Sequence, residues 1–163
     1  MKKGLLTLLF IVSITTTLQA QEIYTEIRRT AQAKVNDPTA DLLIRKFSMF
    51  KLDALNYLAI RMKEEFPDSS ADLLDKEALS LNVFITNYTR SLVESRNMPA
   101  NHQKKIIKAY MDASYSNPLF NDKDTELVLT YFNDASSLTR FSLDTDWRRA
   151  VLAAKAAMKS INK

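Results

Sequence analysis

Residues 71–96 read ADLLDKEALSLNVFITNYTRSLVESR, and this stretch decides the fold. Its apolar residues recur at alternating steps of four and three, which places them along one face of an α-helix. The members of this seam are Leu74, Ala78, Leu81, Ile85, Tyr88 and Leu92. Three heptads are enough to pair with one neighbouring helix and too few to indicate an extended coiled coil. The stretch therefore predicts one long helix of a hairpin.

The predicted partner in that hairpin is the helix immediately before it, over about residues 39–65. One of its faces carries Phe47, Phe50, Ala54, Leu58 and Met62, and another carries Leu42, Met49, Leu52 and Leu55. So wide an apolar arc predicts a central helix that is contacted on two sides. The break between the two helices contains Pro67, and after it Ser69 and Asp72 have the spacing of a capping box.

The rest of the chain also shows helical spacing, and no stretch alternates as a β-strand would. Further helices are predicted over about residues 22–35, 100–114, 123–138 and 145–161. Because glycine is absent after residue 20, Asn97 is expected to be the left-handed residue that ends the 71–96 helix. Asp144 is expected to cap the last helix. The predicted fold is an all-α, single compact bundle of five or six helices, in which helices two and three form a long antiparallel hairpin.

The first 20 residues, MKKGLLTLLFIVSITTTLQA, have the pattern of a cleaved export signal. Two lysines precede an apolar run of ten residues, and the small residue Ala20 suits the position before the cut. We therefore expect residues 1–20 to be a cleaved signal peptide and residues 21–163 to be a single helical domain. The apolar run is shorter than the roughly 20 residues that span a membrane, and the chain has no cysteine for a lipid anchor. The signal resembles those of Gram-negative bacteria, so we expect a periplasmic or secreted protein with no transmembrane segment in the mature chain.

The residue types missing from 21–163 exclude several kinds of site. This segment has no glycine, no cysteine and one histidine, His102. Phosphate-binding loops and dinucleotide fingerprints need glycine, thiolate metal sites and disulfides need cysteine, and histidine zinc sites need several histidines. We therefore expect no catalytic residues of these types, no cofactor and no metal. With 21 basic and 19 acidic residues, the segment has a formal charge of only +2, and nucleic acid is not an expected partner of an exported protein.

Two runs of charged residues have ordinary structural interpretations, one as the start of a helix and the other as a solvent-exposed helix face. The acidic run 121–126 lacks the glycine and the glutamate of a calcium-binding EF-hand loop, so we interpret it as the start of a helix. The last helix carries five basic residues and no acid after Asp146: Arg148, Arg149, Lys155, Lys159 and Lys163. We interpret these mainly as a solvated face, with contact to an anionic lipid, a polyanion or an acidic partner as the alternative.

Aromatic residues are concentrated near the C-terminus, where residues 110–147 hold seven of the 14 that follow the signal. Trp147 lies on an apolar stripe and is predicted to be buried. Three others lie in or beside predicted loops, so an exposed aromatic cluster is expected to contain them. With their basic neighbours they form the candidate partner-binding set, which consists of Tyr115, Phe120, Arg140, Phe141 and Arg149. Aromatic rings suit this role because they bring a large contact area to a binding surface.

These observations favour a non-enzymatic helical binding or interaction protein of the bacterial cell envelope, whose partner is a protein or another envelope component. One alternative is a carboxylate-dependent hydrolase acting on envelope polysaccharide, which needs two acidic side chains facing each other across a cleft. Another is a self-associating structural protein, which forms a homo-oligomer through a large apolar patch. The spacing of the carboxylates brings no such acidic pair together, so the binding protein is the preferred hypothesis.

Overall fold

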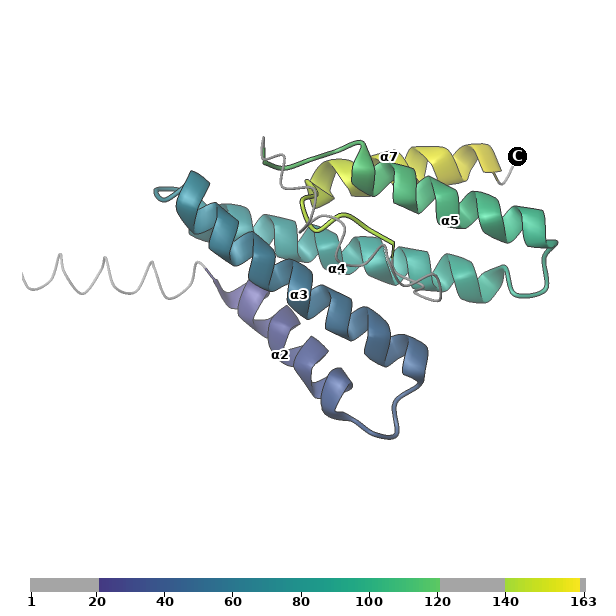
Figure 1. Cartoon of the computed structure of the whole chain (residues 1–163), viewed down its shortest axis with the longest axis horizontal. Helices are drawn as coiled ribbons and strands as arrows, with labels where there is room; N and C mark the ends of the chain where they lie inside the picture. Colours follow the sequence, from purple (N-terminus) through teal and green to yellow (C-terminus); the bar gives the residue numbers. More distant parts are fainter. Residues whose placement is uncertain (1–20, 121–139, 162–163) are drawn as a thin grey trace, which may run out of the picture.

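In the computed structural model, which describes residues 21–120 and 140–161, every regular element is an α-helix. The helices are α2 (Glu22–Asn36), α3 (Leu42–Glu65), α4 (Ser70–Glu94), α5 (Ala100–Tyr115) and α7 (Trp147–Ile161) (Figure 1). The predicted all-α bundle is confirmed, and α3 and α4 form its long antiparallel hairpin. The expected signal peptide and the helix expected over 123–138 lie outside the described residues. None of the described helices is both long enough and apolar enough to cross a membrane.

The helix α4 lies at the centre of the bundle. It packs against α2 and α3 on one side and against α5 and α7 on the other (Figure 1). Its predicted seam is buried from Leu74 to Tyr88, and Phe84 on the adjacent face is buried as well. The 39–65 helix is contacted on two sides, as predicted, because α3 packs against both α2 and α4. Of its second apolar face, Leu52 and Leu55 are buried, whereas Leu42 and Met49 are exposed.

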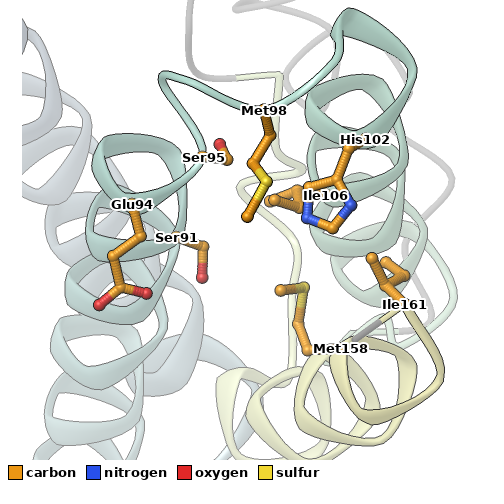
Figure 2. A pocket seen from close by; sticks show the side chains of 8 residues that line it. All are labelled: Ser91, Glu94, Ser95, Met98, His102, Ile106, Met158 and Ile161. Atoms are coloured by element: carbon orange, nitrogen blue, oxygen red, sulfur yellow. The ribbon is translucent and has the colours of Figure 1, made fainter. Parts of the chain in front are cut away.

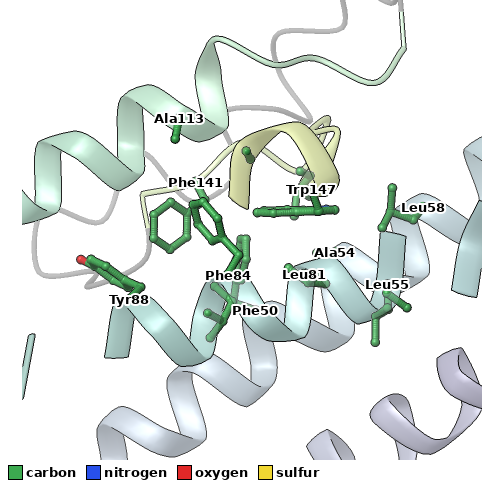
Figure 3. Close-up of a cluster of buried hydrophobic side chains, with 14 of the residues drawn as sticks. Phe50, Ala54, Leu55, Leu58, Leu81, Phe84, Tyr88, Ala113, Phe141 and Trp147 are labelled. Carbon is green, nitrogen blue, oxygen red and sulfur yellow. The ribbon is translucent and has the colours of Figure 1, made fainter. Parts of the chain in front are cut away.

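A cluster of aromatic side chains forms the part of the core where α3, α4, α5 and the start of α7 meet (Figure 3). The ring centre of Phe84 on α4 lies 5.2 Å from those of Tyr110 and Phe141 and 5.3 Å from that of Trp147. Phe50 on α3 reaches Phe141 at 5.6 Å and Trp147 at 6.1 Å. Edge-to-face pairs of this kind contribute about 0.5–1.5 kcal/mol each beyond the area that they bury. These contacts join both layers of the bundle into one core.

Two acidic side chains of α4 fix the starts of other helices. The carboxylate of Glu77 accepts the backbone N–H of Trp147, the first residue of α7, at 2.7 Å. Likewise, the carboxylate of Asp75 accepts the N–H of Tyr24 in the first turn of α2 at 2.8 Å. The N–H groups of a first helical turn have no partner within the helix, and their partial positive charge favours carboxylates. The central helix therefore sets where α2 and α7 begin.

Three helix ends differ from the sequence predictions. Asp144 does not cap α7, because its carboxylate accepts the N–H groups of residues 119 and 120, which draws this segment onto the end of α5. Asp146 caps α7 instead and accepts the N–H three residues later at 2.9 Å. At the start of α4 the side chain of Ser69 makes no capping hydrogen bond. Asn97 is not left-handed, since no described residue has a positive φ, and α4 ends in backbone-bonded turns.

Candidate binding groove

The structure buries two of the three rings that were expected at the surface. Phe141 is fully buried within the aromatic cluster. Phe120 is 4% exposed, and the guanidinium of Arg61 lies 5.2 Å from its ring centre. The prediction that these two rings belong to an exposed cluster is wrong, because Phe120, shortly after α5, and Phe141, shortly before α7, both pack into the core.

The other members of the candidate set, Tyr115, Arg140 and Arg149, are more accessible to solvent than the two phenylalanines. Burial raises the pKa of Tyr115 to about 12, against the opposing effect of the Arg140 charge, and both side chains are half-buried. Arg149 is exposed and forms an ion pair with Asp146 at 3.3 Å. Trp147 is buried, as predicted. The five residues of the set therefore do not form one exposed aromatic and basic surface.

A buried network of hydrogen bonds fixes the start of α7 to the end of α5. The hydroxyl of Ser114 lies 2.9 Å from that of Thr145 and accepts the N–H of Ser142 at 2.9 Å. The hydroxyl of Thr145 donates to the Ser142 carbonyl at 2.9 Å, and the N–H of Asp146 donates to the Asn117 carbonyl at 2.8 Å. Because the hydroxyls are buried, breaking one of these bonds would leave a polar group without water. The N-terminal end of α7 is therefore held in place.

A groove lies between the C-terminal half of α7, the C-terminal half of α4 and α5. It consists of two adjoining hollows of about 510 and 500 Å³, which share Ser91 of α4 and Met158 of α7. The first hollow is also lined by Phe84, Asn87, Arg90, Tyr110, Val151, Ala154, Lys155 and Lys159. The second is also lined by Glu94, Ser95, Met98, His102, Ile106 and Ile161. Each hollow has the size of a small-molecule pocket.

The floor of the groove is apolar. Its buried members are Phe84, Ile106, Tyr110 and Ala154. Burial raises the pKa of the Tyr110 hydroxyl, and a hydrogen bond with Ser91 acts in the opposite direction, so this hydroxyl is neutral at physiological pH. In the second hollow, Met98 and Met158 extend toward each other from opposite walls, beside the isoleucines of α5 and α7 (Figure 2).

Three cations surround the first hollow: Arg90 of α4, and Lys155 and Lys159 of α7. All three are exposed, and none forms a hydrogen bond or an ion pair with another residue in the described parts of the chain. By contrast, Lys108 on α5 is paired with an aspartate one turn away. Lysines four residues apart share one helix face, so positive charge is concentrated along the α7 wall and faces Arg90.

The polar side chains of the second hollow do not assemble into a catalytic set. Glu94 and His102 line it from different helices (Figure 2), and within the described ranges they form no hydrogen bond with each other. The hydroxyl of Ser95 donates to the Leu92 carbonyl at 3.1 Å. Among the residues that the structure describes, no three potential metal-ligating side chains come together.

One carboxyl has a strongly raised pKa, and it lies outside the groove. Burial, followed by the charge of Asp146, raises the pKa of Glu77 to about 7. A hydrolase would use an acid of this kind at an open cleft. The Glu77 side chain is only 1% exposed and is bound to the N–H of Trp147, so its place in the molecule is that of a buried helix cap.

The stripe of α4 that leads into the groove was not predicted. It consists of Glu77, outside the groove, and of Phe84 and Ser91, which line it. The three recur at steps of seven, each one position before a member of the apolar seam. Two of the three are polar, so apolar periodicity does not indicate this second stripe. The sequence does indicate the basic face of α7 with Lys155 and Lys159, which we interpreted mainly as solvated.

Comparisons with protein-family models, with curated proteins and with solved structures find no match to this chain. The groove combines an apolar floor, a cluster of cations at one end and an opening to solvent, which is an arrangement suited to binding.

Proposed function

We propose that this protein is an exported, non-enzymatic binding protein of the bacterial cell envelope, and that it holds its partner in the groove between α4, α5 and α7. The export part of the proposal is supported by the basic, apolar and small-residue pattern of residues 1–20. The binding part is supported by the groove itself.

One observation carries the proposal: beside an apolar floor lie three exposed cations that form no ion pair with any other residue the structure describes. Beside this floor, Val151, Met158 and Ile161 line the groove and are only half-buried. Apolar surface that is left open to water costs free energy, and so does the mutual repulsion of like charges. A partner that covers these side chains and brings negative charge relieves both costs. The polar side chains of the groove offer no base-and-nucleophile pair, which favours binding over catalysis.

The test is to block the groove at Ser91, the α4 residue shared by both hollows. Ser91→Phe places a ring in the middle of the groove, and Ser91→Ala is the matched control because it removes the hydroxyl without adding bulk. Each protein is immobilised and exposed to envelope extract of the source cells, and the retained lipids, glycans and proteins are identified by mass spectrometry.

We expect a component that the wild type and Ser91→Ala retain and that Ser91→Phe loses at least tenfold. Circular dichroism must show equal helix content in the three proteins. Equal retention by all three, with the fold intact, would overturn the proposal that the groove is the binding site.

A further inference from the structure

The groove is chemically asymmetric along its length. Arg90, Lys155 and Lys159 surround the first hollow, and none of the described residues that line it is acidic. The second hollow carries no Lys or Arg, and Met158 continues into it from the first. A ligand that matches both hollows therefore has negative charge at one end and apolar surface at the other.

Two polar groups of the second hollow, Ser95 and Glu94, do not interrupt its apolar surface, whereas the half-buried imidazole of His102 lies beside Ile106 (Figure 2). The Ser95 hydroxyl is already bonded to a backbone carbonyl. Glu94 is exposed, and Figure 2 shows its carboxylate turned away from Met98 and Met158. Its negative charge repels an anion from this end of the groove, which fixes the orientation of a charged ligand.

The walls of the groove favour an alkyl chain over a peptide. From Asn87 to Ser95 the α4 wall is about 12 Å long at a rise of roughly 1.5 Å per residue. An extended peptide would bring backbone N–H and C=O groups that helical walls, whose own backbone groups are bonded internally, do not satisfy. An alkyl chain brings no such groups, and flexible methionine side chains adapt to it.

We infer that the ligand is a single-chain lipid with an anionic head. The head lies among Arg90, Lys155 and Lys159, and the tail runs past Met158 into the second hollow. This inference rests on the proposed function and names the class of component that the groove holds. Carboxylate and phosphate heads share the required chemistry, since both accept charge-assisted hydrogen bonds from guanidinium and ammonium groups.

The experiment is isothermal titration calorimetry on protein purified from cells that express the full chain. Three probes with the same twelve-carbon tail are used below their micelle concentrations: dodecanoate, dodecyl phosphate and dodecyltrimethylammonium. We expect at least one anionic probe to bind with one-to-one stoichiometry and at least tenfold more tightly than the cationic probe. Equal affinity for the anionic and cationic probes would overturn the inference, and so would the absence of binding by folded protein.

Variants then locate the head and the tail. Arg90→Gln combined with Lys155→Gln should weaken binding of the anionic probes at least tenfold. The matched control is Lys104→Gln combined with Lys105→Gln on α5, two exposed cations outside the groove, which should change affinity less than twofold. Ser91→Phe should abolish binding of the same probes. If both charge pairs reduce affinity equally, the head does not lie in the groove and the inference fails.

Failure of the inference is distinguishable from failure of the proposed function. The wild type could bind none of the three probes and still retain an envelope component that Ser91→Phe does not retain. The groove would then be a binding site for a ligand of another class. If the retained component is a protein, the lipid inference is overturned and the proposed function stands. If nothing distinguishes wild type from Ser91→Phe in either experiment, both are wrong.

Discussion

Phe141 lies in the segment before α7 and is fully buried, although a position outside a helix does not itself indicate burial. Its ring centre lies 5.2 Å from that of Phe84 and 5.0 Å from that of Tyr88. The neighbouring Ser142 is tied by its N–H to the Ser114 hydroxyl, which holds the backbone against α5. The ring therefore belongs to the core, and its contribution is to stability.

Truncation of this ring should unfold or strongly destabilise the protein. Phe141→Ala removes edge-to-face contacts and leaves a cavity, for which we expect a loss of about 3–5 kcal/mol in the free energy of unfolding. The control Leu152→Ala alters a side chain that is 67% exposed and should cost less than about 0.5 kcal/mol. Urea unfolding followed by circular dichroism measures both. A loss below about 1 kcal/mol for Phe141→Ala would contradict the buried position.

Residue by residue, periodicity predicts burial well inside helices and poorly outside them. Leu81 and Ile85 are buried where the seam places them, because helix geometry fixes the direction of each side chain. Phe120 and Phe141 follow no such rule. Their burial depends on long-range hydrogen bonds, such as those that Asp144 accepts from the backbone, and no local pattern reports these.

Among the elements, α7 depends on α4 for its start. Glu77 is buried and accepts the N–H of Trp147, and its pKa is raised to about 7 from 4.5 by burial and by the charge of Asp146. The folded state therefore holds a proton on Glu77 in the range between these two values, where the unfolded chain has already released it. The contribution of Glu77 to stability is therefore complete below this range and is lost as the pH rises through it.

Replacement of Glu77 by glutamine should remove this pH dependence. Glu77→Gln keeps an oxygen that accepts the Trp147 N–H but carries no charge. Between pH 5 and pH 8 the wild type should lose up to about 3 kcal/mol more of its free energy of unfolding than the variant loses. Urea titrations across this range measure the difference, and Glu26→Gln on exposed α2 surface is the control, which should behave as the wild type does. Parallel pH profiles for wild type and Glu77→Gln would contradict the role given to this cap.

The helices themselves were largely predictable, and their arrangement was only partly so. The seam of α4 and the break at Pro67 predict the long hairpin, because heptad spacing and proline act locally. The central place of α4 was not evident, since its second stripe includes the buried Glu77 and the half-buried Ser91. A buried carboxylate that caps another helix has no signature in apolar periodicity.

For the molecule as a whole, the two ends of α7 have different roles. The N-terminal end is held by the Ser114–Thr145 hydroxyl pair and by Glu77, whereas the C-terminal half forms a wall of the groove. The cationic part of the groove was visible in the sequence as Lys155 and Lys159. Arg90, which faces these lysines, and the apolar floor could not be predicted in the same way. They come together only when three helices pack, and no single stretch of sequence specifies that packing.

The most direct test follows the methionine methyl groups by NMR while dodecanoate is added to protein carrying ¹³C-methyl methionine. Met98 and Met158 line the groove, Met62 is buried in the core, and Met49 is exposed on α3 outside the groove. The predicted result is a saturable shift of the Met98 and Met158 signals, with those of Met49 and Met62 unchanged. Unchanged Met98 and Met158 signals at saturating dodecanoate, or a larger shift at Met49, would contradict binding of an anionic lipid in this groove.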